Sequence, residues 1–215
     1  MKWRGEALSD DCRMALQRLS RTKSLRHFYL AGGTALALRL GHRISVDLDF
    51  FSVRNPLTGP ARAALLEEIS KAAPVRVDEQ IDRTLHLRLA GTHVSFFHYT
   101  APLLARCERR EGVQIASTTD IGAMKLSALV GRGSRKDFLD LYVLTTRVIP
   151  LKNLLQKAQA KFRDSTDFTA QALRALVYFK DAESEDPPTL LQPISWNDVM
   201  THFRKAVRAI GRTFM

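Results

Sequence analysis

The spacing of apolar residues in the first quarter of the chain predicts one helix and two strands. Residues 10–21 place their apolar positions with helical spacing. Residues 27–31 form a short apolar run, which is typical of a buried strand. Residues 45–51 alternate acidic and apolar side chains at period two, the pattern of a strand with one polar and one buried face.

A glycine turn separates the two predicted strands. Gly32 and Gly33 follow the first strand directly, and Thr34 opens an apolar segment that ends at Gly41. Threonine favours the N-cap of a helix, and glycine favours the position just after its end. The order therefore predicts a strand, a tight turn, a helix capped by Thr34 and a glycine stop.

The middle of the chain has the pattern of a sheet, and the last part has the pattern of helices. A helix is predicted over residues 61–73, and strands are predicted over residues 75–77, 84–89 and 93–99. After Asp120 the strand pattern stops, and helical segments follow at residues 121–129, 137–147, 151–162, 168–179 and 196–211. We expect an α/β (α+β) fold, with a mixed-sheet core over residues 1–118 and a helical region over residues 119–215 that completes the site.

The charge of the chain indicates an anionic partner. The 215 residues include 33 Lys and Arg against 22 Asp and Glu, which gives a formal net charge of +11. Such an excess favours polyanions such as nucleic acid or nucleotides. Hydrophobic residues make up 45% of the chain, so the composition excludes the class of disordered chains.

The cysteines and the hydropathy of the chain indicate the cellular compartment in which the protein works. Neither Cys12 nor Cys107 has a metal ligand at suitable spacing, so the sequence predicts neither a zinc site nor a disulfide framework. The six histidines show no metal-ligand spacing either. The first residues are charged, and no apolar run approaches the length of a membrane span. We therefore expect a cytoplasmic protein without a membrane partner.

The glycine turn suits the phosphates of a nucleotide. A strand that runs into Gly32, Gly33 and Thr34 at a helix N-terminus offers backbone N–H groups and the positive end of a helix dipole. Glycine also lets a phosphate approach the main chain closely. These three residues are therefore candidates for binding a nucleoside triphosphate (NTP).

Two carboxylates on the following strand suit a divalent cation. Asp47 and Asp49 are two residues apart, so both leave the same strand face, and Ser45 shares their parity. Carboxylates are hard oxygen ligands for Mg²⁺, which neutralises the transferring phosphate in phosphoryl and nucleotidyl transfer. The alternative is a tight turn beside a solvated strand face. The order of turn, helix and carboxylate pair favours a catalytic site.

A second charged group lies in the helical region. Lys125 belongs to a helix that is otherwise apolar on one face, and a lysine is rarely buried without a partner. Asp137 and Asp140 are three residues apart on one face of the next helix and are candidate partners. The alternative is that Lys125 is a surface lysine and that Asp137 only interacts with a helix dipole.

In this order, the motifs resemble those of the AbiEii toxin-like nucleotidyltransferases of bacterial abortive-infection and toxin–antitoxin systems. The resemblance rests on residues 30–38, residues 41–51, Lys125 and residues 136–142, and it covers residues 27–147. It implies a polymerase-beta-like nucleotidyltransferase mixed sheet followed by a helical C-terminal half. Mg²⁺ and an NTP are the implied ligands, and tRNA is the acceptor for some relatives.

The resemblance also implies roles for single residues. By position, Gly33 and Thr34 would hold the triphosphate, and Asp47 and Asp49 would bind the metal. Gly32 and Ser45 belong to the same candidate nucleotide-binding set, as neighbours of these four residues.

One departure from the family pattern concerns a third carboxylate. Related transferases usually carry it on a later strand, but residues 93–99 contain no acid, and Ser95 occupies the expected position. Lys125 and Asp137 would complete the site by resemblance, and Asp137 or a water would fill the gap. We expect Ser95 to face the same side as Asp49.

The leading interpretation is a Mg²⁺-dependent nucleotidyltransferase that transfers a nucleoside monophosphate (NMP) from an NTP to an RNA, such as tRNA, or to a protein acceptor. Such an enzyme would be the toxin of a type IV toxin–antitoxin or abortive-infection system, with a cognate antitoxin as partner. A second interpretation is a catalytically degenerate relative that only binds nucleotide, RNA or a partner protein. A third is a kinase-like phosphotransferase.

Two further patterns concern the surface and the core. Arg204, Arg208 and Arg212 recur every four residues, which makes one basic stripe on a helix, and the segment before it adds charge at Lys152, Lys157, Lys161 and Arg163. The stripe could carry a tRNA backbone or be only a solvated face. Core positions in the sheet, rather than a base-stacking surface, are expected for Phe50, Phe51, Phe96 and Phe97.

Overall fold

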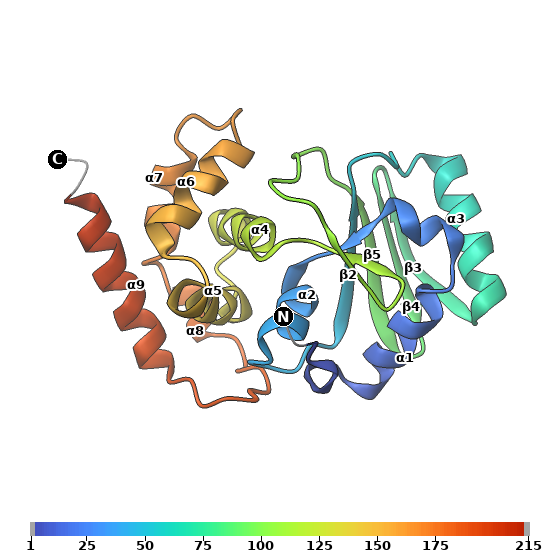
Figure 1. The fold of residues 1–215 in the computed structure, drawn as a ribbon, viewed down its shortest axis with the longest axis horizontal. Helices are drawn as coiled ribbons and strands as arrows, with labels where there is room; N and C mark the ends of the chain where they lie inside the picture. The colour runs from blue at the N-terminus through green and yellow to red at the C-terminus, as the bar shows by residue number, and fades with distance from the viewer. Residues whose placement is uncertain (1–2, 213–215) are drawn as a thin grey trace. The chain divides into compact units, whose positions relative to one another are not determined.

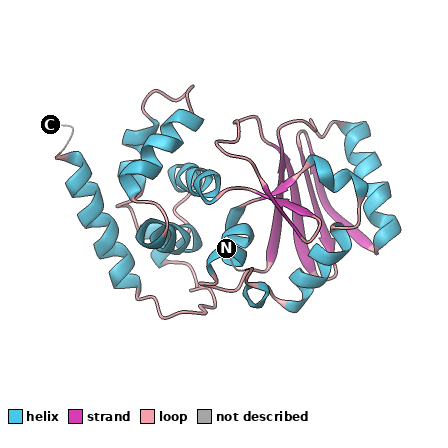
Figure 2. Cartoon of the chain, in the orientation of Figure 1, coloured by secondary structure: helices cyan, strands magenta, loops and turns pink. Residues whose placement is uncertain are grey.

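The structure is a computed structural model, and it describes residues 3–212. The chain divides into two compact units. The first extends to Pro102 and includes Arg106–Ser117, and the second comprises Leu103–Ala105 and the chain from Thr118 onward. The seven strands of the described chain all belong to the first unit, which also contains helices, whereas the second unit is built of helices joined by loops (Figure 2).

The first unit is organised around a seven-stranded mixed sheet with the strand order β3-β4-β5-β2-β1-β7-β6. The central strand β2 pairs in parallel with β5 and antiparallel with β1. The strands are β1 (Tyr29–Leu30), β2 (Asp47–Ser52), β3 (Val75–Ile81), β4 (Thr84–Leu89), β5 (Thr92–His98), β6 (Glu108–Arg110) and β7 (Val113–Ile115). The sheet confirms the expected mixed α/β class.

One face of this sheet carries the core of the first unit. The side chains of Leu48 and Phe50 on β2, of Val94 and Phe96 on β5, and of Leu85 and Leu87 on β4 have no exposed surface. Burial of such apolar surface is the main favourable contribution to folding. Helices α1 (Asp10–Leu19) and α3 (Gly59–Ala72) pack together on one side of the sheet (Figure 1).

Several boundaries differ from those expected. The first strand contains only Tyr29–Leu30, because a 3₁₀ helix, η2 (Lys23–His27), occupies the residues before it. Helix α2 (Gly32–Leu40) begins at the glycine pair, and Gly41 ends it in the left-handed conformation, as predicted. Strands β6 and β7 lacked a prediction, since three-residue strands are too short to show a period.

The second unit packs its helices around α4 (Thr118–Gly131), which contacts α5 (Arg135–Arg147), α6 (Leu151–Lys161) and α7 (Phe168–Ala175). Gly122 on α4 allows this close packing: a Cβ there would lie 2.5 Å from Leu144 Cδ2 and 2.8 Å from Leu154 Cδ1. A short helix, α8 (Lys180–Glu183), and the long α9 (Trp196–Gly211) follow.

Aromatic side chains fix the last helices of this unit. Phe138 on α5 contacts the rings of Phe179, Trp196 and Phe203, with centroid separations between 5.0 and 5.9 Å. Tilted and edge-to-face aromatic pairs of this kind stabilise packing beyond the area they bury. Within the part of the chain that the structure describes, no helix combines the length and the apolar character that crossing a membrane needs.

Candidate active site

Strand β2 presents both predicted carboxylates on one face. Asp47 and Asp49 are half-buried, whereas Leu48 and Phe50 between and after them are fully buried on the other face. The alternation of a strand accounts for this division, and it confirms the expectation that both carboxylates point to the same side. We refer to this side of the sheet as the carboxylate face.

The N-terminus of α2 approaches Asp49 closely. Gly32 has a φ of +63°, and a Cβ on Gly32 would lie only 2.8 Å from Asp49 Oδ2. The Ala31 N–H donates to the carbonyl of Asp49 at 3.0 Å. A glycine is therefore needed here both for its conformation and for the space it leaves. The predicted turn and carboxylate pair do come together.

Thr34 does not cap the helix. Ala31 is the N-cap residue, and the hydroxyl of the buried Thr34 instead donates to the carbonyl of Asp47 and shares a 2.7 Å hydrogen bond with Ser45 Oγ. The cap prediction was wrong because a tertiary partner takes the hydroxyl that capping would use. The Thr34 and Ser45 hydroxyls thus join α2 to the start of β2. Triphosphate binding by these two residues stays a prediction.

Cys12 lies behind the carboxylate pair. Its Sγ is 3.9 Å from the carbonyl of Asp47, and the thiol is buried. Burial, together with the negative charges of Asp47 and Asp49, raises the pKa of the Cys12 thiol to about 12. Because the thiolate is the nucleophilic form, Cys12 is an inert core residue here.

Ser95 occupies the position that the sequence indicated. Strands β2 and β5 are parallel, with Asp49 opposite Ser95, while Val94 and Phe96 are buried on the other face. Ser95 Oγ lies 2.9 Å from Nδ1 of His86, which stands opposite Ser95 on β4. The expected orientation of Ser95 is confirmed. His86 was missed, because only strand register reveals which residue faces Ser95.

A charged network lies near the sheet edge. Asp78 on β3 contacts Arg76 at 2.8 Å, Arg88 at 3.2 Å and His93 at 3.4 Å. Desolvation opposes the ionisation of Asp78, but the hydrogen bond and charge of Arg76 and the charges of Arg88 and His93 outweigh it, so the pKa of Asp78 is lowered. No sequence pattern indicated this network, because its members come from three strands.

The four sheet phenylalanines divide between the two faces. Phe50 and Phe96 are core residues with stacked rings 5.3 Å apart, as expected. Phe51 and Phe97 are half-buried on the carboxylate face, with stacked rings 5.0 Å apart. The core prediction is therefore wrong for this second pair, because strand alternation sends neighbouring residues to opposite sides.

The charged group of the second unit is a buried ion cluster. Lys125 Nζ lies 2.6 Å from Asp137 Oδ1 and 2.7 Å from Asp140 Oδ2. Asp137 is 3% exposed, and its Oδ2 has no hydrogen-bond partner within the described chain. The sequence spacing correctly indicated this pairing. A catalytic role for Lys125 and Asp137 stays a prediction.

A second buried ion pair lies in the helical unit. Lys161 Nζ lies 2.9 Å from Asp120 Oδ1, and both side chains have no exposed surface. Asp120 also accepts hydrogen bonds from the backbone N–H groups of Leu104 and Ala105. Lys161 was expected to add charge to the basic surface. This expectation is wrong, because the Lys161 ammonium is buried in its ion pair with Asp120.

The predicted basic stripe is present on α9. Arg204 and Arg208 are exposed on the helix, and Arg212 is exposed directly after it. The guanidinium of Arg204 lies over the ring of Phe179, 5.3 Å from its centroid. The opposite face of α9 buries Val199 and Phe203. Helical periodicity therefore separates a packed face from a solvent-facing basic face.

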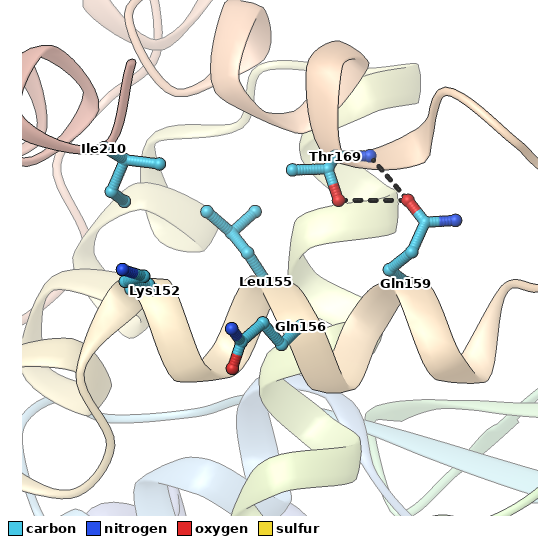
Figure 3. A pocket seen from close by; sticks show the side chains of 6 residues that line it. All are labelled: Lys152, Leu155, Gln156, Gln159, Thr169 and Ile210. Carbon is cyan, nitrogen blue, oxygen red and sulfur yellow. Dashed lines mark hydrogen bonds between the residues drawn. The ribbon is translucent and has the colours of Figure 1, made fainter. Parts of the chain in front are cut away.

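A separate apolar cavity of about 250 Å³ lies among α6, α7 and the end of α9. Figure 3 shows the side chains that line it, which are Lys152, Leu155, Gln156, Gln159, Thr169 and Ile210. Gln159 accepts hydrogen bonds from both the N–H and the hydroxyl of Thr169, which ties α7 to α6. None of these lining residues belongs to the candidate catalytic, metal-binding or nucleotide-binding set.

Three comparisons with known proteins place this geometry in context. Residues 14–112 match the family model described as nucleotidyl transferase AbiEii toxin, type IV TA system. The uncharacterized protein aq_aa25 of Aquifex aeolicus (strain VF5) is 37% identical over 204 residues, which cover 94% of this chain and 96% of the relative.

Solved structures share the fold. JHP933 from Helicobacter pylori has a TM-score of 0.56 and 19% identity, covering 96% of this chain and 94% of its own. MenT4, a nucleotidyltransferase toxin from Mycobacterium tuberculosis H37Rv, has a TM-score of 0.54 and 15% identity, covering 93% and 84%. At these identities the matches establish a nucleotidyltransferase fold and nothing finer.

Proposed function

Because the chain belongs to the AbiEii nucleotidyltransferase toxin family, we propose that it transfers an NMP from an NTP to an RNA, such as tRNA, or to a protein acceptor. The observation that carries this proposal is the close approach of the α2 N-terminus to a carboxylate pair. A Cβ on Gly32 would meet Asp49 Oδ2 at 2.8 Å, so phosphate-binding N–H groups and metal-binding oxygens share one small region.

The carboxylate face suits one divalent cation shared with a nucleotide. Asp47 and Asp49 are half-buried on one strand face, which suits hard oxygen ligation. Within the described chain no cluster of three or more His, Cys, Asp or Glu side chains could hold a metal alone. The remaining ligands of Mg²⁺ would therefore come from the triphosphate and water. When bound, Mg²⁺ neutralises charge on the transferring phosphate.

The protein's own groups bind and orient the triphosphate in this proposal. The first N–H groups of α2, at Gly32 and Gly33, donate to phosphate oxygens, since a helix leaves these donors without internal partners. Thr34 and Ser45 hold α2 against β2 through their 2.7 Å hydrogen bond. Their contribution is then to keep the N–H donors at a fixed distance from Asp49.

Lys125 and Asp137 belong to the proposed catalytic set as well. In the cluster with Lys125, Asp137 Oδ2 is buried without a hydrogen bond in the described chain. A buried carboxylate oxygen without a donor costs free energy. A donor group of a substrate would relieve that cost, which supports a role beyond holding the two helices together.

The positive charge of the protein is the basis for the proposed acceptor of the NMP. The chain has a net charge of +11, and the exposed guanidinium groups of Arg204, Arg208 and Arg212 follow one side of α9 and its end. Regularly spaced cations of this kind suit a phosphate backbone. We propose RNA as acceptor and a toxin role in a type IV toxin–antitoxin or abortive-infection system, restrained by a cognate antitoxin.

The test is label transfer by the purified protein. It is incubated with Mg²⁺, total tRNA and each NTP labelled at the α-phosphate, and the same reaction is repeated with γ-labelled ATP. Transfer of the α-label supports the proposal, whereas transfer of only the γ-label would identify a phosphotransferase. Mg²⁺-dependent triphosphate binding without any transfer would identify a degenerate relative that acts by binding.

A further inference from the structure

Three side chains form a row across the carboxylate face. Asp49 on β2 stands opposite Ser95 on β5, and Ser95 stands opposite His86 on β4. Because neighbouring strands are about 4.8 Å apart, Ser95 lies between the carboxylate and the imidazole. All three side chains are half-buried, and the 2.9 Å hydrogen bond joins Ser95 Oγ to His86 Nδ1.

The row extends away from the phosphate-binding turn. In the sheet order β4-β5-β2-β1, Gly32 follows β1 on one side of β2, and Ser95 and His86 lie on the other side. In phosphoryl transfer the attacking and leaving oxygens are roughly in line through the phosphorus. With the pyrophosphate held at Gly32, an in-line attack directed along the row would bring the hydroxyl in from the side of Ser95.

We propose that Ser95 and His86 together accept the proton of the attacking hydroxyl, in the position where related enzymes carry a third carboxylate. The inference rests on the proposed function. The acceptor oxygen forms a bond to the α-phosphorus as the bond to the bridging oxygen breaks and pyrophosphate leaves. The hydroxyl proton passes to Ser95 Oγ, and the Ser95 proton passes to His86 Nδ1. The imidazolium then releases a proton to solvent.

Surrounding contacts hold the imidazole for this task. The ring of Phe97 meets the ring of His86 edge-to-face, with centroids 5.6 Å apart. Glu79 on β3 stands opposite His86. The next charged and titratable side chains on this face are Arg88 on β4 and His93 on β5, together with Asp78, which contacts both, and Arg76, which stands opposite Arg88. A serine hydroxyl bonded to a histidine nitrogen is the arrangement that moves protons in many hydrolases and transferases.

The kinetic test compares two histidines of the same sheet. His86→Ala and Ser95→Ala are expected to lower kcat by roughly 10²- to 10⁴-fold, the range for loss of a general base, with little change in triphosphate affinity. His98→Ala is the matched control, since His98 follows the parity of the opposite face and accepts a hydrogen bond from Arg83 at 3.2 Å. Added imidazole should restore part of the turnover of His86→Ala and none of that of Asp49→Asn.

A spectroscopic test needs no turnover. In protein labelled with ¹⁵N in its histidine rings and free of triphosphate, Ser95→Ala should shift the Nδ1 resonance of His86 and leave that of His98 unchanged. An unmoved His86 resonance would overturn the pairing. Full kcat in His86→Ala, with an active wild type, would overturn the inference while the proposed function stands. A wild type that transfers no NMP, whether or not it binds triphosphate, would overturn both the inference and the proposed function.

Discussion

The carboxylates of the two units have opposite surroundings. Asp47 and Asp49 are half-buried on one strand face of the first unit. In the second unit, Asp120 and Asp140 have no exposed surface, and each lies within 3 Å of a lysine ammonium. Removing a charge from water costs several kcal/mol unless a partner offsets it. The buried carboxylates therefore stabilise helix packing through their ion pairs, whereas we propose that the half-buried pair binds a ligand.

Removing either half-buried carboxylate should have the largest effect on activity. We expect Asp47→Ala and Asp49→Ala each to lower transfer at least ~10³-fold, about 4 kcal/mol of transition-state stabilisation. Stability should change by no more than about 0.5 kcal/mol, because partly exposed positions tolerate such changes. Initial rates and urea unfolding of the same preparations measure both. An unfolded variant would show that these carboxylates also hold the fold.

Removing a buried carboxylate should give the reverse result. Asp120→Ala leaves the Lys161 ammonium without its 2.9 Å partner, and it removes the acceptor of the Leu104 and Ala105 N–H groups. We expect a loss of about 3–5 kcal/mol in the free energy of unfolding. Urea denaturation followed by circular dichroism measures it. A stability equal to that of the wild type would contradict the structural role.

Asp137 lies between the two groups of this comparison, because it is buried in an ion pair and is also proposed to be catalytic. Asp137→Asn keeps the shape of the side chain and removes its charge from the contact with Lys125. We expect turnover to fall by about tenfold or more while triphosphate affinity is kept, and added imidazole should not restore it. Equal turnover with lower stability would assign Asp137 to the fold alone.

The basic stripe should have the smallest effect per residue. Changing Arg204, Arg208 and Arg212 together to Glu should weaken RNA binding and leave triphosphate affinity unchanged. Each phosphate contact adds about 0.7–0.9 to the log–log salt slope, so the slope should fall by roughly 2–3. Filter binding at several salt concentrations measures it. RNA binding that does not depend on salt would argue for a protein acceptor.

Sequence periodicity predicted what depends on single elements. The alternation from Asp47 onward correctly gave a strand with both carboxylates on one face, and Gly41 correctly marked the end of α2. Periodicity could not predict contacts between residues of different elements. Thr34 matched a helix cap but bonds to Asp47 and Ser45 across the fold, and His86 acquires meaning only through its register with Ser95.

Binding of a spectroscopic metal tests the central claim most directly. Mn²⁺ can replace Mg²⁺ and is followed by electron paramagnetic resonance, with and without ATP, in the wild type and in the double variant Asp47→Asn, Asp49→Asn. We predict ATP-dependent binding of Mn²⁺ by the wild type and its loss in the folded double variant. Equal Mn²⁺ binding by both proteins would contradict the assignment of the site to this carboxylate pair.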